Sequence, residues 1–346
     1  MARMTSKTGV RRGILCGGNL VVDRVKIVNA FPRRGTLVNI LEQTRGTGGA
    51  ALNNSINLKV LDPKLPVAVM GRLGDDADGR LIMDAMRKLR IGTTHVRTSR
   101  TATAYTDVFT EQTGGARTFF HFRGANAEWD RGDIDFDALS GFRIVHIGYI
   151  LLLDRLDAPD KKYGTRMAGV LAEFRRRGVK TAVDVVTDLS GDFRTKVTAA
   201  LRHTDYLVLN EIEAAETTGI PARDAGDEVK RDNIFAAAEK LMRLGDGTAC
   251  VVIHMPEGAC GLEAGGTPFW VPSLRVPEKD IKGTAGAGDA FASGILYALH
   301  EGRPLEEAIR LAHGMAAKCL YSPTCTGGAV SFKELIRFIK SHSKAR

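Results

Sequence analysis

The most informative stretch of this chain reads Gly283-Thr284-Ala285-Gly286-Ala287-Gly288-Asp289-Ala290-Phe291. Small residues run directly into an aspartate, and apolar residues three and four positions apart then begin a helical pattern. Small residues allow backbone amides to approach a ligand closely. Amides at a helix N-terminus are unpaired and lie at the positive end of the helix dipole. The stretch therefore predicts an anion-binding turn, for which phosphate is the usual occupant.

Asp289 lies at the edge of this predicted turn, where its carboxylate would repel a resting phosphate. The simplest chemical reason for it is a general base that takes a proton from a hydroxyl attacking phosphorus. The alternative is structural, because glycine-rich turns before helices are common and aspartate is a favoured N-cap residue. The stretch is not a Walker loop, since no Gly-Lys-Ser/Thr follows, and it is a poor dinucleotide fingerprint.

Length and composition bound the class of protein. The 346 residues suffice for one large α/β domain or two ordinary ones. The formal net charge of +9 comes partly from a basic N-terminal tail containing Arg3 and Lys7, and partly from Arg175-Arg176-Arg177. We interpret it as a solvated basic surface with a frayed tail, and attraction of anionic substrates is the second interpretation. No aromatic-interleaved basic motif or zinc-finger spacing is present, so we expect no nucleic-acid partner.

Cysteine usage and hydropathy predict the compartment. The five cysteines are Cys16, Cys250, Cys260, Cys319 and Cys325. Their number is odd and their spacing fits no zinc motif, so we expect buried thiols in a reducing compartment. No apolar stretch is long enough to span a membrane and the first residues lack a signal-peptide core. We therefore expect a cytoplasmic protein with no membrane partner.

Short apolar runs alternate with helical patterns along the chain. The expected core strands are Gly13–Cys16, Val67–Met70, Ile144–Ile147, Thr181–Val186, Tyr206–Leu209 and Cys250–Ile253. The expected helices are Ala50–Leu61, Gly79–Leu89, Lys162–Arg177 and Asn233–Leu244. Strands spaced by helices predict a mostly parallel sheet covered on both faces, a three-layer α/β/α fold. Ligands bind such sheets beyond the C-terminal ends of the strands.

Four further strands lack covering helices. Tyr105–Thr110 and Arg117–Phe122 flank Gly114-Gly115 as in a β-hairpin, and Val21–Val28 and Leu37–Gln43 flank a Pro-Arg-Arg-Gly turn. These strands predict a small, discontinuous sheet from about 21–45 and 103–125, standing off the main body.

A flap of this kind over the strand ends would exclude water from a phosphoryl transfer. The alternative is an ordinary edge sheet or a dimer contact, and the two roles are compatible. We expect apolar faces at Val108, Phe120 and Phe122 to favour a homodimer through this sheet.

Four motifs, in order, resemble those of the PfkB/ribokinase family of sugar and nucleoside kinases. They are the 283–289 stretch, Gly48-Gly49-Ala50-Ala51-Leu52-Asn53, the glycine–aspartate element 71–79, and Asn210-Glu211-Ile212-Glu213. The resemblance runs from Gly17 to about Gly328. It implies a ribokinase-like three-layer fold, with 1–346 as a single domain and the small sheet as its lid.

The resemblance also implies roles at the reacting centre. Asp289 is similar to the family's catalytic base, and the amides of Gly286, Ala287 and Gly288 to the hole for charge building on the transferring phosphoryl group. Preorganised amides suit that task because they need no reorganisation as the charge develops.

The acceptor side is assigned in the same way. Asp23 is similar in place to the family's substrate aspartate, and a carboxylate can accept hydrogen bonds from two adjacent hydroxyls. Gly48, Gly49 and Asn53 would hold the sugar by close backbone approach and an amide side chain. The alternatives are a strand-end or turn residue for Asp23 and a glycine turn capping the following helix.

Two residues near the lid complete the acceptor side. Asn126 resembles a family position near the hinge of the lid and could contact substrate. Arg123 is a candidate clamp if the acceptor carries an anionic group, since a guanidinium suits phosphate or carboxylate. A solvated lid arginine is the alternative for Arg123.

The nucleotide side follows from the same resemblance. The residues expected there are Asn210, Glu213, His254, Gly258, Gly261 and Thr284. Magnesium keeps most of its waters, so Mg²⁺ would be held through water near Glu213 and no direct ligand cluster is needed. The alternative for Glu213 is a first-turn carboxylate stabilised by the helix dipole.

Three positions depart from the family pattern. Gly283 replaces an aspartate that helps relatives to ligate a monovalent cation, which puts that cation site in doubt. Pro256 stands near a usual glycine of the nucleotide loop, and its missing N–H removes one contact. Arg72 is a basic residue within the glycine–aspartate element 71–79, which is not typical of the family.

The sequence therefore predicts an ATP-dependent kinase that transfers the γ-phosphoryl group to a hydroxyl of a sugar, polyol or nucleoside. Few aromatic residues are present and no base-stacking pair is evident, which favours a sugar or polyol. The alternative is a catalytically silent sugar-binding or sensing member of the same fold. Asp289 argues against it, because a binding module needs no base.

Overall fold

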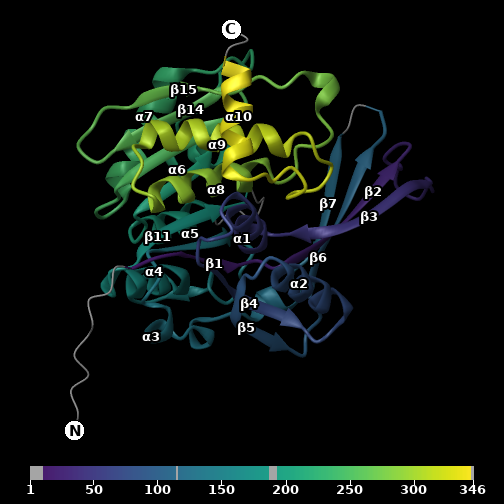
Figure 1. Cartoon of the computed structure of the whole chain (residues 1–346), viewed down its shortest axis with the longest axis horizontal. Helices are drawn as coiled ribbons and strands as arrows, with labels where there is room; N and C mark the ends of the chain where they lie inside the picture. Colours follow the sequence, from purple (N-terminus) through teal and green to yellow (C-terminus); the bar gives the residue numbers. More distant parts are fainter. Residues whose placement is uncertain (1–10, 114–115, 187–192, 344–346) are drawn as a thin grey trace.

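The computed structural model describes residues 11–113, 116–186 and 193–343. The basic tail at Arg3 and Lys7 and the hairpin turn Gly114-Gly115 lie outside these residues. The main sheet has nine strands in the order β15-β14-β13-β12-β11-β8-β1-β4-β5, and Figure 1 shows helices on both of its sides. Its strands are β1 (Ile14–Gly18), β4 (Val67–Gly74), β5 (Gly92–Ser99), β8 (Ile144–Ile150), β11 (Lys180–Val185), β12 (Tyr206–Asn210), β13 (Cys250–Met255), β14 (Gly258–Glu263) and β15 (Phe269–Pro272).

Strand direction divides this sheet into two parts. The strands from β5 to β13 pair in parallel, whereas β13, β14 and β15 form an antiparallel meander at one edge. The three-layer, mostly parallel architecture expected from the sequence is thus confirmed. Every core strand and helix expected in the previous section is present, with ends shifted by a few residues.

Two hydrophobic cores cover the two faces of the main sheet. Side chains alternate along β1, so that Ile14 and Cys16 enter one core and Leu15 the other. The helices of the first core are α1 (Ala50–Leu61), α2 (Ala77–Lys88), α8 (Ala287–His300), α9 (Leu305–Cys319) and α10 (Phe332–Ser343). Those of the second are α3 (Phe136–Leu139), α4 (Arg166–Arg176), α5 (Phe193–Leu201), α6 (Glu211–Thr218) and α7 (Arg231–Leu244). A two-stranded ribbon, β9 (Pro159–Asp160) and β10 (Gly164–Thr165), precedes α4.

A separate four-stranded sheet projects from one side of the body (Figure 1). Its order is β3-β2-β6-β7, with strands β2 (Val21–Val28), β3 (Ile40–Gly48), β6 (Ala104–Glu111) and β7 (Arg117–Phe122). Strands β2 and β6 are parallel, and β3 and β7 add to them antiparallel. The small sheet expected from the sequence is thereby confirmed.

The two faces of the small sheet differ in character. The outer face carries ring pairs, with Phe109 against Phe120 at 5.7 Å and Tyr105 against Phe122 at 5.3 Å between ring centroids. Val108 is buried and lines a cavity on the inner face. Our expectation that Val108 is exposed beside Phe120 and Phe122 is therefore wrong, because period-2 alternation puts it on the opposite face of β6.

Strand β3 begins and ends later than the sequence suggested. Leu37 is 85% exposed, whereas the strand continues through Gly46 to Gly48 and leads directly into α1. Glycines lower the intrinsic tendency to form a strand, which is why periodicity placed its end too early. In the described ranges, the helices are all too short or too polar to cross a bilayer.

Candidate active site

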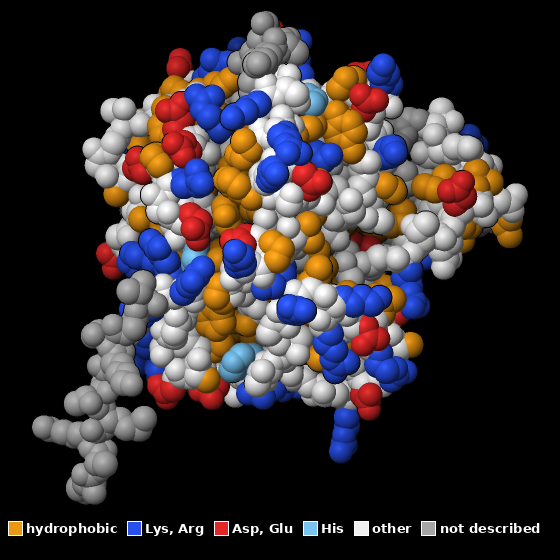
Figure 2. All heavy atoms as spheres, in the orientation of Figure 1, with side chains coloured by type: hydrophobic (Ala, Val, Ile, Leu, Met, Phe, Trp, Pro, Cys, Tyr) orange, Lys and Arg blue, Asp and Glu red, His pale blue; other side chains and the backbone are white. Residues whose placement is uncertain are grey.

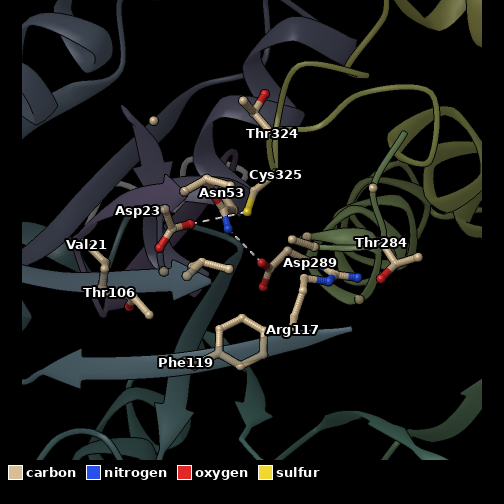
Figure 3. A pocket seen from close by; sticks show the side chains of 18 of the residues that line it. Val21, Asp23, Asn53, Thr106, Arg117, Phe119, Thr284, Asp289, Thr324 and Cys325 are labelled. Carbon is tan, nitrogen blue, oxygen red and sulfur yellow. Dashed lines mark hydrogen bonds between the residues drawn. The ribbon is translucent and has the colours of Figure 1, made fainter. Parts of the chain in front are cut away.

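A cavity of about 990 Å³ lies between the carboxyl ends of the parallel strands and the inner face of the small sheet. Its walls come from β2, β6 and β7, from the start of α1, from the ends of β8, β11 and β12, and from the turn that begins α8. Figure 3 shows Asp23 and Phe119 of the small sheet facing Asn53 of α1, Asp289 of α8 and Cys325 of the loop at 323–325. This is the place at which parallel α/β sheets bind ligands.

Asp289 lies in the first turn of α8 and is 5% exposed. One of its oxygens accepts a hydrogen bond from Asn53 Nδ2 at 2.7 Å, and the Tyr149 hydroxyl donates to the carboxylate at 2.8 Å. Burial raises the pKa of the Asp289 carboxyl, and the two donors partly oppose this. The arrangement holds the carboxylate in one orientation and makes it more basic than an exposed aspartate.

The turn before Asp289 requires glycine at one position. Gly286 has a φ of 80°, and a Cβ there would lie 2.6 Å from Cys325 Cα. Gly286 and Gly288 line the cavity, as does Thr284. Ala287 does not, and its amide donates to Thr284 O at 3.3 Å. Of the three backbone amides expected to form the anion hole, those of Gly286 and Gly288 therefore belong to residues that line the cavity.

Asp23 faces the cavity from β2 (Figure 3). Its Oδ2 accepts a hydrogen bond from Cys325 Sγ at 3.4 Å, and burial raises the pKa of the Asp23 carboxyl to about 6. A Cβ at Gly48 would lie 2.2 Å from Asp23 Oδ2. Gly48, which we expected to approach the substrate, therefore leaves space for the Asp23 carboxylate, which we expected to bind the substrate.

The start of α1 supplies the next two predicted residues. Gly49 has a φ of 88°, and a Cβ there would lie 2.5 Å from Asn19 O, so the turn into α1 requires glycine. Gly49 and Asn53 both line the cavity. Asn53 Oδ1 is buried without a hydrogen-bond partner among the described residues, which leaves one acceptor free for a ligand.

Buried carboxylates gather on the other side of Asp289. Asn210 and Glu213 form a capping box at the start of α6, in which each side chain accepts from the other's backbone amide. Burial raises the pKa of Glu213 to about 8, and Asp289 adds to the rise. Burial also raises the pKa of Asp184 at the end of β11, with Asp289 and Glu213 as further causes. All four side chains line the same cavity.

His254 is the only one of three residues predicted on β13 and β14 to line the cavity. Its ring packs on Phe291 at 4.7 Å between centroids, and burial lowers its pKa to about 4. A Cβ at Gly258 would lie 2.5 Å from the Trp270 ring, and one at Gly261 2.6 Å from the Phe269 ring. These two glycines therefore serve packing of the β14–β15 hairpin.

Two residues predicted to contact the acceptor substrate lie outside the cavity. Asn126 is buried and bridges the backbone of Leu20, accepting from its N–H and donating to its C=O at 3.2 Å each. Arg123 donates to Asp154 and to Leu151 O, both at 2.7 Å. The arginine that does line the cavity is Arg117, on β7.

The sequence analysis missed several cavity residues. Tyr149 lies just beyond the predicted strand Ile144–Ile147, and Asp184 lies within the C-terminal half of the predicted strand Thr181–Val186. The rule on carboxyl ends of parallel strands could therefore have found them. Arg117 and His121 lie on a predicted strand, but only the inward parity of β7 distinguishes them from Thr118 and Phe120. No local signal gives that parity.

The three departures from the family pattern receive structural accounts. Arg72 forms a bidentate ion pair with Asp133, at 2.9 and 2.7 Å. Pro256 lies in the β13–β14 turn, where its C=O accepts from Ser273 Oγ. Gly283 lines the cavity, and a Cβ there would lie 3.0 Å from Ser322 O.

The chain is similar to several known proteins. A family model described as pfkB family carbohydrate kinase matches residues 11–330. The ribokinase of Arabidopsis thaliana is 25% identical over 327 residues, covering 93% of this chain and 80% of that protein. The 5-dehydro-2-deoxygluconokinase of Geobacillus kaustophilus is 25% identical over 333 residues, covering 94% and 92%. The solved structure of Arabidopsis thaliana ribokinase complexed with ribose and ATP aligns with a TM-score of 0.77 and 22% identity, covering 95% of this chain and 99% of that one.

Proposed function

Because the chain belongs to the pfkB family of carbohydrate kinases, we propose that it transfers the γ-phosphoryl group of ATP to a hydroxyl of a sugar, polyol or nucleoside. The observation that carries the proposal is Asp289, which is buried, follows directly after a glycine turn and is oriented by Asn53 and Tyr149. The proposal is also supported by the shared fold, because the similar ribokinase structure contains ribose and ATP.

In the proposed reaction, Asp289 removes the proton of the acceptor hydroxyl. The hydroxyl oxygen forms the new bond to the γ-phosphorus, and the bond from that phosphorus to the bridging oxygen breaks, so that ADP leaves with the electron pair. A raised pKa suits Asp289 to this task, because a base works best when its pKa approaches the operating pH. The amides of Gly286 and Gly288 would bind the oxygens of the transferring group.

The acceptor would lie between Asp23 and Asp289. Asp23 and Asn53 Oδ1 offer hydrogen-bond acceptors to hydroxyl groups, which supports a polyhydroxylated ligand. Arg123 and Asn126 would act from outside the cavity, by holding the base of the small sheet. The small sheet would serve as the lid, because it forms the wall opposite the strand ends.

The donor and its metal would occupy the carboxylate side. The described residues include no group of three His, Cys, Asp or Glu side chains placed to hold a metal directly. Asp184 and Glu213, whose carboxyl groups line the cavity, would hold Mg²⁺ through water. When bound, Mg²⁺ would neutralise charge on the phosphates. Gly283 offers a monovalent cation no side-chain ligand.

Two further expectations concern assembly and location. Phe120 and Phe122 are exposed on β7, and Phe31, Leu37, Ile40 and Leu41 are exposed at the opposite edge of the small sheet. Figure 2 shows hydrophobic side chains at the projecting end of this sheet. We propose a homodimer through it. The five cysteines are buried and free, which supports the expected reducing cytoplasm.

Replacement of the base tests the central proposal. Purified protein with Mg-ATP and a panel of sugars, polyols and nucleosides should release ADP with at least one acceptor. Asp289→Asn should then lower turnover by about 10²-fold or more while acceptor binding, followed by calorimetry, persists. Asp232→Asn, an exposed position on α7, is the matched control. Full activity of Asp289→Asn would show that another group takes the proton.

A further inference from the structure

Tyr149 engages both oxygens of the proposed base. It lies near the end of β8 and lines the cavity. Its hydroxyl is 2.8 Å from Asp289 Oδ1 and 2.9 Å from Oδ2. A phenol has one proton to donate, so the hydroxyl shares this proton between the two carboxylate oxygens. Asn53 Nδ2 donates to Oδ2 as well, at 2.7 Å.

The Tyr149 hydroxyl stands where a reacting hydroxyl has to stand. A general base takes a proton from a group within about 2.6–3.2 Å, and the Tyr149 oxygen meets this distance to both oxygens of Asp289. Asp289 is 5% exposed, so little of its carboxylate is open to a further donor. An acceptor hydroxyl or a water molecule that gives its proton to Asp289 must therefore first replace Tyr149.

The chemistry of Tyr149 suits it to hold this place without reacting. Burial, and after it the charge of Asp289, raise the pKa of the Tyr149 phenol well above its ordinary value. The phenol therefore keeps its proton at neutral pH and does not attack ATP itself. Its backbone is anchored, because the Tyr149 amide donates to Asn19 Oδ1 at 2.6 Å. Release of the hydroxyl would therefore move the side chain and leave the strand in place.

We infer that Tyr149 is a positioning residue that occupies Asp289 until an acceptor hydroxyl replaces it, and that it thereby keeps the base from activating water. The inference rests on the proposed kinase function. An acceptor brings further hydroxyls to Asp23 and Asn53, and these hydrogen bonds offset the loss of the Tyr149 contact. A water molecule brings no such groups, so it cannot displace Tyr149 as readily. The device would limit hydrolysis of the phosphoryl donor, a side reaction that a transferase has to exclude.

Hydrolysis of ATP without an acceptor tests the inference directly. Tyr149→Phe keeps the ring and removes the hydroxyl, so ADP release from Mg-ATP alone should rise about 10-fold or more over the parent. The rise should vanish when Asp289→Asn is added, because the freed base is its cause. Tyr163→Phe, between β9 and β10 and not among the residues that line the cavity, is the matched control and should equal the parent. An unchanged or lower rate in Tyr149→Phe, or a rise that persists with Asp289→Asn, overturns the inference.

A titration of Asp289 separates this role from a merely structural one. In protein with carbon-13 in its aspartate carboxyls, the Asp289 signal is the one missing from Asp289→Asn. The Tyr149 hydrogen bond lowers the pKa of Asp289, so Tyr149→Phe should move this titration to higher pH, and Tyr163→Phe should not. An unchanged titration in Tyr149→Phe overturns the inference. Both variants keep the other titratable groups that act on Asp289, which are the carboxyls of Asp23, Asp184 and Glu213 and the thiols of Cys319 and Cys325.

The inference and the kinase proposal fail in different ways, because neither measurement needs an acceptor. If no sugar, polyol or nucleoside supports turnover while hydrolysis rises in Tyr149→Phe, the kinase proposal alone is refuted. If the parent phosphorylates an acceptor and Tyr149→Phe changes neither hydrolysis nor the titration of Asp289, this inference alone is refuted.

Discussion

Replacing Gly48 by alanine puts a methyl group into the space of the Asp23 carboxylate. The new Cβ would lie 2.2 Å from Oδ2, 2.5 Å from Cγ and 2.6 Å from Oδ1. Non-bonded heavy atoms reach their optimal separation at about 3.5 Å, so the carboxylate must withdraw by roughly 1 Å. The backbone at Gly48 has no positive φ, so the substitution acts through this contact and not through strand strain.

The expected effect falls on acceptor binding. Hydrogen bonds to a charged group contribute about 1.5–3 kcal/mol, so losing the alignment of one raises acceptor KM about 10- to 150-fold. The kcat should change much less, because the three atoms nearest to the new methyl group all belong to Asp23, and Asp289 keeps its donors Asn53 and Tyr149. The assay is ADP release at saturating ATP over a range of acceptor concentrations, with acceptor calorimetry beside it.

Gly46→Ala is the matched control on the same strand. The nearest atom to a Cβ there is Thr324 Cγ2 at 3.9 Å, an ordinary van der Waals contact. This variant should retain the parental acceptor KM. If Gly48→Ala and Gly46→Ala have the same acceptor KM, Asp23 does not bind the acceptor. A melting-temperature measurement on both excludes global unfolding as the cause of any difference.

Three further outcomes are expected. Folding raises the pKa of Glu213 from 4.5 to about 8, so this carboxyl stabilises the folded state most below pH 4.5 and loses that effect as the pH rises to 8. Glu213→Gln should therefore flatten the fall in melting temperature of the nucleotide-free protein between these two pH values. An unchanged slope would contradict this. Added potassium should leave turnover nearly unchanged, because Gly283 supplies no side-chain oxygen, and a strong activation in a salt series would show that the backbone alone makes the site. Phe120→Asp with Phe122→Asp should convert a dimer to a monomer in sedimentation, since both rings are exposed, whereas a parent that already sediments as a monomer would rule out the interface.

Local patterns predicted the elements that lie in regular positions. The bounds of β2, β7 and α1 agree with those expected, because alternation and helical periodicity there reflect burial directly. The edge strand β5 and the strand β14, next to the opposite edge, escaped the analysis. Strand β5 carries mostly polar side chains, and β14 lies where we expected a nucleotide loop. Burial of β14 depends on Phe269 and Trp270 of the neighbouring strand, which no local window includes.

The site divides in a similar way. Asp289 and Asn53 were predicted because glycine motifs mark their positions, and Asp23 was predicted from its place in the family pattern; the structure brings all three to one cavity. Arg123 and Arg117 show the limit of such reasoning. Both are arginines near β7, and only the strand's register directs Arg117 inward, while Arg123 beyond the strand end pairs with Asp154. Charge and sequence position alone could not distinguish them.

Cys325 touches both halves of the cavity. Its thiol donates to Asp23, and its backbone packs against Gly286 so closely that no side chain fits between them. A shift of Asp23 on acceptor binding would therefore act on the proposed phosphate turn through one residue, and the reverse would hold equally. Reciprocity requires that whatever factor the nucleotide adds to acceptor affinity, the acceptor adds to nucleotide affinity. A factor above one would make the ternary complex more abundant than independent sites would give, and a factor below one would make it rarer.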